Sequence, residues 1–173
     1  MRRLLLLRHA KTERAEAGER DQDRKLIARG RADASVIGTY MTRHGLIPDL
    51  VLVSPARRAA ETWTLVADAL AKAPRAVSDA RIYNADPATL VELIREVRQA
   101  SVLVVGHNPG MHELAVQLIA SGDVEARERI NEKLPTSGLV VIDFPFDDWS
   151  RLHLNSGRLE RFVSPRLIAE ATD

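Results

Sequence analysis

Histidine and arginine residues follow three apolar stretches of the chain. Arg8 and His9 follow the four leucines of MRRLLLLRHAKT, and His107 and Asn108 follow the apolar run SVLVVG. A third apolar run, LVLV, precedes SPARR, which contains Arg58. Guanidinium groups match phosphate oxygens in a bidentate fashion, and a neutral imidazole attacks phosphorus to give a covalent intermediate. These residue types predict a phosphate pocket with a histidine nucleophile.

The two adjacent arginines of SPARR are expected to lie on different faces of a helix. A cation in the first helical turn opposes the helix dipole by roughly 0.3–1 kcal/mol. Arg57 is in line with Glu61 and can pair with it at i,i+4. Arg58 is in line with Thr62, on the flank that turns inward. A residue that breaks a local rule without compensation indicates function, so we expect Arg58 at the phosphate.

Alternating strands and helices are needed to bring these residues together. Short apolar runs bounded by charges predict buried strands at 4–7, 50–53 and 101–106, with a short strand near Val77. Helices are expected at 31–45, 54–72 and 87–100, and after Gly110. We predict two late strands, LVVIDF and RLHLNSG, joined by the turn PFDDW. For the polar stretch SGDVEARERINEKLP before them we predict no element.

Helix ends are marked by capping residues. Ser54 is the expected N-cap of one helix, with Pro55 at its first position, and Asp86 precedes Pro87 in the same way. Gly45 provides an ordinary stop for the helix before it.

This order of elements predicts an α/β fold. We expect a three-layer α/β/α sandwich with a largely parallel, mixed central sheet, in a single domain over residues 1–173. In such sheets the ligand binds at the carboxyl ends of the strands. The arginines and histidines are therefore expected to converge at one edge of the sheet.

The composition excludes several classes of protein. The chain has 173 residues, no cysteine and a net charge of +1, from 25 basic and 24 acidic side chains. The lack of cysteine excludes disulfides and a cysteine nucleophile, and it suits a reducing compartment, so we expect a cytoplasmic protein. The charge balance provides no stripe for a polyanion, so we expect no nucleic-acid partner. Four leucines are too few for a signal peptide, and no apolar run approaches a membrane span.

Three segments together resemble a known family. LLLLRHAKT, LVLVSPARRAAETW and LVVGHNPG, in this order and at these intervals, are similar to segments of the histidine phosphatase superfamily, whose fold is phosphoglycerate mutase-like. That superfamily has an Arg-His-Gly triplet after its first strand, and this chain has Ala10 in place of the glycine. Its length and the DxDRxLxxRG pattern from Asp21 to Gly30 most resemble the SixA-type phosphohistidine phosphatase branch. The resemblance covers residues 4 to about 118.

The resemblance implies roles for individual residues. It implies that His9 is the nucleophile and that Arg8 and Arg58 are phosphate ligands. It also implies that His107 is a second histidine, which stabilises the transferring phosphoryl group. The activity it implies is that of a phosphatase without metal or other cofactor, acting on a phosphorylated substrate such as a phosphohistidine-bearing signalling protein.

Two further residues stand where the family often makes additional phosphate contacts, Thr12 and Asn108. Thr12 belongs to a highly charged segment, Lys11 to Arg29, that we expect to be a solvated loop. Because this segment directly follows His9, it could also cover the pocket.

No carboxylate matches the general acid that the family's mutases and phosphoesterases use. Asp79, Asp86 and Glu113 are the candidates, and Asp86 already has an explanation as a helix N-cap. An enzyme without a dedicated acid is expected to favour phosphohistidine, whose leaving nitrogen is readily protonated, over alkyl phosphate esters.

Other functions remain open at this stage. The chain could be a small-molecule phosphoesterase or phosphomutase. It could also be a non-catalytic module that binds phosphate, or one that binds a metal, since two histidines and a carboxylate can hold a transition metal. Flanking arginines argue against a bound cation.

Overall fold

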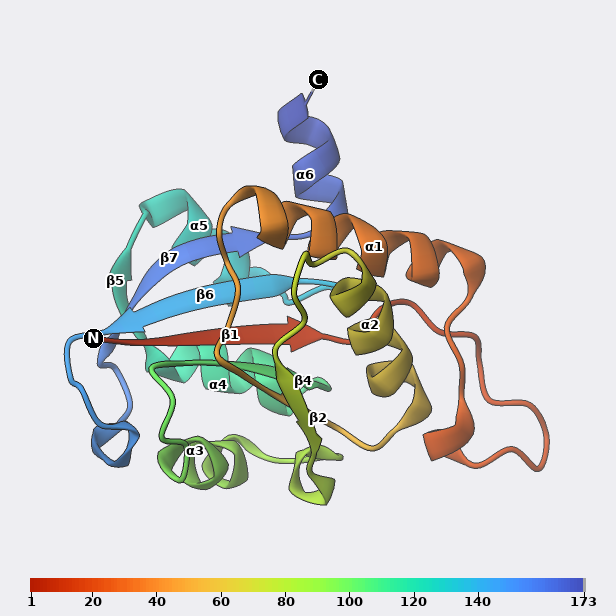
Figure 1. Cartoon of the computed structure of the whole chain (residues 1–173), viewed down its shortest axis with the longest axis horizontal. Coiled ribbons are helices and arrows are strands. Elements are labelled where there is room, and N and C mark those ends of the chain that lie inside the picture. Colours follow the sequence, from red (N-terminus) through yellow and green to blue (C-terminus); the bar gives the residue numbers. More distant parts are fainter. Residues whose placement is uncertain (173) are drawn as a thin grey trace.

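The central feature of the computed structural model, which describes residues 1–172, is a seven-stranded sheet with the strand order β3-β2-β4-β1-β6-β7-β5 (Figure 1). β1 pairs in parallel with β4, and β4 and β3 both pair in parallel with β2. β6 runs antiparallel to β1 and β7, and β5 is parallel to β7. The expected mixed, largely parallel sheet is therefore confirmed. The strands are β1 (Arg2–Arg8), β2 (Leu50–Val53), β3 (Arg75–Ser78), β4 (Ser101–Gly106), β5 (Ile119–Gly122), β6 (Leu139–Phe144) and β7 (Gly157–Val163).

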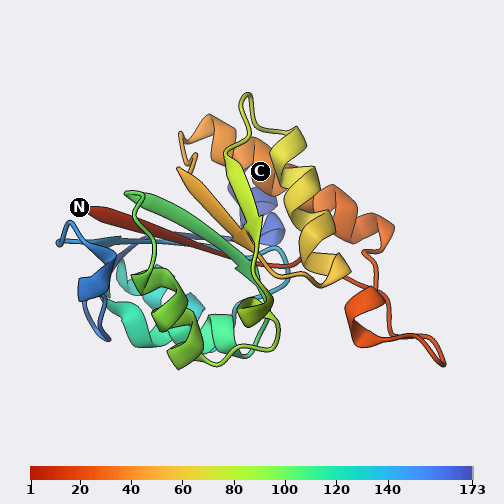
Figure 2. The same ribbon diagram turned by 60° about the horizontal axis from the view of Figure 1, so that its bottom comes forward.

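Helices cover both faces of the sheet, as Figure 2 shows with the sheet between the orange and yellow helices and the green ones. They are α1 (Ala28–Arg43), α2 (Arg57–Asp68), α3 (Pro87–Arg95), α4 (Gly110–Leu118), α5 (Val124–Glu132) and α6 (Pro165–Thr172), with short 3₁₀ turns η1 (Asp21–Asp23), η2 (Ala80–Ile82) and η3 (Trp149–Arg151). α1 and α2 cover one face and α3, α4 and α5 the other. The α/β/α architecture follows from these two layers.

The four leucines that open the chain belong to both layers of the core. Side chains alternate across a strand, so Leu4 and Leu6 pack in the cluster under α3 and α4, whereas Leu5 and Leu7 pack under α1 and α2. All four are at most 1% exposed. A strand buried on both faces reads as a continuous apolar run, as is typical of a central parallel strand.

The ends of three strands meet at one edge of the sheet, as expected. Arg8 is in register with Gly106, and Leu7 and Val53 are both in register with Val105. The segments that follow β1, β2 and β4 therefore begin side by side.

One late strand was predicted wrongly. RLHLNSG is not a strand, because Arg151 closes η3, the residues from Leu152 to Ser156 form no strand, and β7 (GRLERFV) begins only at the last residue of the stretch, Gly157. Leu152 produced the misleading alternation: it is fully buried, but it packs beneath the turn beside Trp149, whose indole N–H donates to the carbonyl of Gln99 at 2.7 Å.

The prediction also missed three elements in the second half of the chain. β5, α5 and α6 were not predicted, although the side chain of Asp123 caps α5 by accepting from the N–H of Ala126 at 2.9 Å. Asp86 caps α3 as expected. No helix among residues 1–172 is long and apolar enough to cross a membrane.

Candidate active site

A polar cavity of about 290 Å³ lies where the three strands end. All six site residues predicted from the sequence line this cavity. Arg8 and His9 lie at the end of β1, and Thr12 lies in the loop that follows them. Arg58 comes from α2, and His107 and Asn108 come from the turn after β4. The remaining lining residues are Lys11, Arg24, Asn84 and Thr136. The pocket therefore contains two imidazoles and four cationic side chains, with no carboxylate among its described lining residues.

Hydrogen bonding fixes the protonation of His9. Its Nδ1 lies 2.8 Å from the carbonyl oxygen of Ala10, and a carbonyl only accepts, so Nδ1 carries the proton. The Nε2 lone pair is therefore free. Burial, together with the nearby His107, Arg58 and Arg8, lowers the pKa of His9 to about 3, although the hydrogen bond to Ala10 acts in the opposite direction. His9 is 8% exposed and stays neutral at physiological pH.

The backbone around His9 is clamped from two sides. The N–H of His9 donates to the carbonyl of Gly106 at 3.0 Å, which continues the β1–β4 pairing by one residue. The N–H of Ala10 donates to the hydroxyl of Thr62 at 2.9 Å, and that hydroxyl donates to the carbonyl of Arg58 at 2.7 Å. Thr62 thus joins the end of β1 to the first turn of α2. The carbonyl of Ala10, which orients His9, is held by this link.

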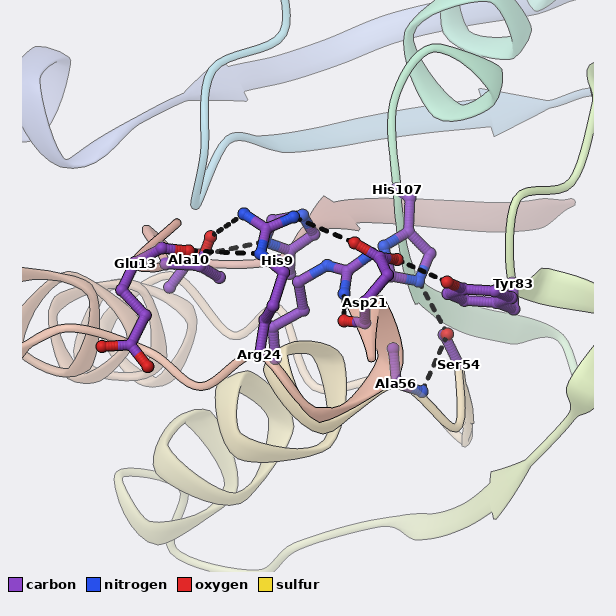
Figure 3. A network of polar contacts seen from close by, with 11 residues as sticks. His9, Ala10, Glu13, Asp21, Arg24, Ser54, Ala56, Tyr83 and His107 are labelled. Carbon is purple, nitrogen blue, oxygen red and sulfur yellow. Dashed lines mark hydrogen bonds and ion pairs between the residues drawn. The ribbon is translucent and has the colours of Figure 1, made fainter. Parts of the chain in front are cut away.

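His107 is oriented by Ser54 (Figure 3). The Nε2 of His107 lies 2.7 Å from the hydroxyl oxygen of Ser54, which in turn accepts from the N–H of Ala56 at 3.3 Å. In the tautomer in which the hydroxyl of Ser54 donates to Nε2, the Nδ1 of His107 carries the ring proton. That Nδ1 is buried without a partner among the described residues. Burial, reinforced by the charge of Arg58, lowers the pKa of His107 to about 4.

The predicted N-cap at Ser54 is therefore wrong. α2 begins at Arg57 after Ala56, and no side chain caps it. The hydroxyl of Ser54 instead faces His107, because Ser54 extends β2 by one residue: its N–H donates to the carbonyl of Val105 at 3.0 Å.

The two neighbouring arginines of α2 differ as the helix phase predicts. Arg57 is exposed and pairs with Glu61 at 2.9 Å. Arg58 is 4% exposed and donates through both terminal nitrogens to Asp21, at 2.7 Å to its carbonyl and 3.0 Å to its carboxylate. Its guanidinium is thereby held at the pocket.

The charged segment after His9 is a mostly exposed loop that projects beyond the tip of β1, as the red-orange trace shows (Figure 1), and its end returns to its beginning, where the N–H of Ile27 donates to the carbonyl of Lys11 at 3.1 Å. Gly30 permits this, because a Cβ at this position would lie 2.1 Å from the carbonyl oxygen of Lys11. The carboxylate of Asp21 also accepts from Arg24 at 3.1 Å and from the hydroxyl of Tyr83, and Arg24 donates to the hydroxyl of Thr12 at 2.7 Å (Figure 3). Asp21 thus bridges two arginines that line the pocket.

These contacts hold Asp21 in its charged form. The hydroxyl of Tyr83, with Arg24 and Arg58, lowers the pKa of Asp21 far below its usual range, and Asp21 raises the pKa of Tyr83. Asp21 is therefore a counter-charge and not a reservoir of protons.

None of the three carboxylates considered as a general acid lines the pocket. Asp79 caps η2 and pairs with Arg81 at 2.8 Å, and Asp86 accepts from the N–H of Thr89 at 2.8 Å as the cap of α3. Glu113 is exposed on α4.

Sequence reasoning missed the roles of several residues in the network. The DxDRxLxxRG pattern contains Asp21 and Arg24 but does not by itself indicate their contacts at the pocket. Ser54 suits a helix cap locally, and no local signal distinguishes Tyr83, which contacts Asp21, or Thr136, which lines the pocket, because the residues beside them are far away in the sequence.

Comparison with known proteins agrees with this geometry. The model of branch 1 of the histidine phosphatase superfamily matches residues 4–86. An uncharacterised protein of Mycobacterium tuberculosis is 35% identical over 164 residues, which cover 92% of this chain and 100% of that protein. A crystal structure assigned as phosphohistidine phosphatase SixA of Agrobacterium tumefaciens has a TM-score of 0.80 at 33% identity, covering 95% of this chain and 98% of that one.

A more distant structure shares the fold. The protein histidine phosphatase SixA, complexed with tungstate, has a TM-score of 0.75 at 22% identity over 96% of this chain and 99% of that one. With the family match and the 33% identical SixA structure, the conclusion is that this chain is a phosphatase of the histidine phosphatase superfamily, of the SixA type.

Proposed function

We propose that the protein hydrolyses phosphohistidine in other proteins through a phosphorylated His9. The observation that carries this proposal is the contact between Nδ1 of His9 and the carbonyl of Ala10, which leaves a neutral, unprotonated Nε2 in a pocket of four cations. A neutral imidazole is the form that attacks phosphorus. The cations favour the phosphoryl group and stabilise the charge that develops on its oxygens.

In the first step the lone pair of His9 Nε2 forms a bond to phosphorus, and the bond from phosphorus to the substrate nitrogen breaks. Arg8 and Arg58 bind the phosphoryl oxygens, and the unpartnered Nδ1–H of His107 donates to one of them. The substrate ring leaves as neutral imidazole when its other nitrogen already carries a proton. The leaving group then needs no proton from the enzyme, consistent with the lack of a lining carboxylate.

In the second step water attacks the phosphorus of phospho-His9. Its oxygen forms the new bond while the Nε2–phosphorus bond breaks, and inorganic phosphate carries away the protons of the water. Because Nδ1 keeps its proton through Ala10, His9 also leaves as neutral imidazole. The same hydrogen bond therefore favours both steps.

Thr12 and Asn108 are proposed as further contacts of the substrate. Asn108 donates through its amide nitrogen to the carbonyl of Leu134 at 2.9 Å, and its buried amide oxygen has no partner among the described residues. An acceptor suits the N–H of a leaving imidazole, or a water molecule, better than an anionic phosphoryl oxygen. The hydroxyl of Thr12, which accepts from Arg24, retains its own hydrogen for a phosphoryl oxygen.

The covalent intermediate is tested by trapping it. Brief reaction with a ³²P-labelled aryl phosphate or phosphohistidine protein, a quench that avoids acid, and peptide mapping should place the label on His9. His9→Ala should abolish turnover and labelling, whereas His153→Ala, at an exposed histidine, should retain both. Rapid turnover without label on any histidine in a rapid-quench experiment would overturn the proposal.

The substrate class is tested by comparing leaving groups under one set of conditions. We expect the highest kcat/KM for a phosphohistidine protein, lower values for aryl phosphates, and the lowest for alkyl esters such as sugar phosphates. An alkyl ester that outruns the phosphoramidate, with activity lost on replacing Asp79, Asp86 or Glu113, would indicate the esterase or mutase alternative. Phosphate binding without any turnover would indicate a binding module.

A further inference from the structure

Two more hollows continue the phosphate pocket along the surface. The first, of about 250 Å³, shares Lys11 and Thr136 with the phosphate pocket. The second, of about 370 Å³, shares Pro135, Ser164 and Arg166 with the first. We name these two hollows together the side groove. The side groove therefore begins at residues that also line the phosphate pocket, so a polypeptide whose phosphoryl group reaches His9 would pass beside it.

Segments distant in the sequence build the side groove. The connection from α5 to β6 provides Pro135 and Thr136, the first turns of α1 provide Arg29 and Asp33, and α6 provides Arg166. The connection from α5 to β6 is held in place by the protein itself, since the N–H of Ser137 donates to the carbonyls of Arg8 and His9 at 3.1 Å. The groove is thereby tied directly to the residues of the phosphate pocket.

The charge of the side groove differs from that of the whole chain, which has nearly equal numbers of basic and acidic residues. Its basic residues are Lys11, Arg29, Arg129, Lys133 and Arg166. Its acidic residues are Asp33, Glu132 and Glu170. Arg29 and Arg166 form ion pairs with Asp33 and Glu170, and Arg129 pairs with Glu125 outside the groove, whereas Lys11 and Lys133 form no ion pair with the described residues. The groove therefore has a positive surplus, next to a pocket that is itself cationic.

The far part of the groove also offers apolar surface. Pro135, Phe162 and Leu167 line it, and they lie beside Lys133 and Arg166. Positive side chains around an apolar strip fit a polypeptide whose side chains are acidic and apolar, and they would repel a basic one.

We propose that the side groove binds the acidic chain segment next to the phosphohistidine of a substrate protein. This inference rests on the proposed function and deepens it. The phosphate pocket alone holds the phosphoryl group, so a small aryl phosphate makes no contact with Arg29 or Arg166. The side groove therefore selects among phosphoproteins and leaves the chemical step unchanged.

Three phosphohistidine peptides of equal length test the proposal, with glutamate, glutamine or lysine at the positions flanking the histidine. The wild-type enzyme should hydrolyse the glutamate peptide with the highest kcat/KM and the lysine peptide with the lowest, and added salt should reduce this difference. The double variant Arg29→Glu/Arg166→Glu should lose about tenfold in kcat/KM on the glutamate peptide and gain on the lysine peptide. The milder Arg29→Gln/Arg166→Gln should show a smaller loss.

Controls separate docking from chemistry. Arg98→Glu, at an exposed arginine in the connection from α3 to β4, should leave the order of the peptides unchanged. Turnover of an aryl phosphate by the Arg29 and Arg166 variants should stay within about twofold of wild type, since rim charges act on encounter and binding.

Two results would overturn the proposal, and they have different consequences for the proposed function. Equal hydrolysis of the three peptides, or an unchanged preference in both double variants, would refute the side groove while leaving the proposed function intact. Turnover of the aryl phosphate with no hydrolysis of any phosphohistidine peptide would refute the proposed substrate class, and the docking proposal with it.

Discussion

At the scale of single residues, Arg57 and Arg58 make a matched pair for testing the site. Arg58 is buried at the pocket and Arg57 is exposed, with an i,i+4 ion pair to Glu61. Arg58→Ala should cost about 2–4 kcal/mol of transition-state stabilisation, the scale of losing a preorganised donor. Arg57→Ala should leave kcat/KM unchanged and cost at most about 0.5 kcal/mol of stability. Steady-state kinetics and urea unfolding of both variants check this, and the opposite ranking of turnover would contradict it.

Turnover should depend little on pH across the range in which an ordinary histidine titrates. Burial lowers the pKa of His9 to about 3, so the nucleophile stays neutral at about pH 5, where a histidine with the ordinary pKa of about 6.5 would be roughly 97% protonated. With an aryl phosphate, kcat/KM corrected for the ionisation of the substrate should stay level down to about pH 5. A fall with an apparent pKa near 6.5 would show that His9 titrates normally.

Stability should depend on pH in the direction that these lowered pKa values set. The pKa values of His9 and His107 are about 3 and 4 in the folded protein, and about 6.5 in the unfolded chain. The unfolded chain therefore binds more protons below about pH 6.5, and the free energy of unfolding should fall as the pH decreases towards these folded values. Urea unfolding at about pH 7.5 and pH 5 should show a smaller fall for His9→Asn than for wild type. His153→Asn, at an exposed site, serves as the control.

At the scale of elements, the charged segment after His9 is coupled to the anion pocket through Asp21. Its carboxylate neutralises the buried Arg58, and its removal leaves that cation unpaired in the ligand-free protein. Asp21→Asn should lower the Tm by roughly 2–6 °C. A bound anion would replace the lost charge, so inorganic phosphate should raise the Tm of the variant more than that of wild type.

Thermal unfolding with and without phosphate checks this coupling. Asp23→Asn is the matched control, because Asp23 is exposed and pairs with Arg20 outside the pocket. Equal phosphate-induced shifts in wild type and Asp21→Asn would show that Asp21 does not oppose anion binding.

At the scale of the whole molecule, the distribution of charge predicts that turnover does not require a divalent cation. Four cations line the pocket, namely Arg8, Lys11, Arg24 and Arg58. Among residues 1–172 no group of three or more histidine and carboxylate side chains is placed to hold a metal. The arginines can supply the positive charge that a metal would provide to a transferring phosphoryl group. Full turnover is therefore expected in excess chelator, and a loss reversed by one divalent metal would contradict this.

Most of the sheet and the six predicted pocket residues could be predicted from the sequence, for a physical reason. A strand buried on both faces needs a nearly unbroken apolar run, so 4–7, 50–53 and 101–106 stand out locally. Parallel strands joined by helices bring their carboxyl ends to one edge. The polar residues after each run must then lie together, which is why Arg8, His9, Arg58 and His107 line one cavity. Helix phase alone separated Arg58 from Arg57.

Only the tertiary structure determined which partners hold these residues in place and how the late elements of the chain pack. Asp21 meets Arg58 and Tyr83 across 37 and 62 positions of sequence, and no local pattern encodes such contacts. Ser54 suits an N-cap locally, but its hydroxyl faces His107 because β2 extends through it. β5 carries little periodic signal of its own and is fixed by pairing with the distant β7, whereas α6 has an amphipathic pattern that the prediction overlooked and packs against α1. Local patterns determine which residues are buried, whereas long-range packing determines which polar groups become partners.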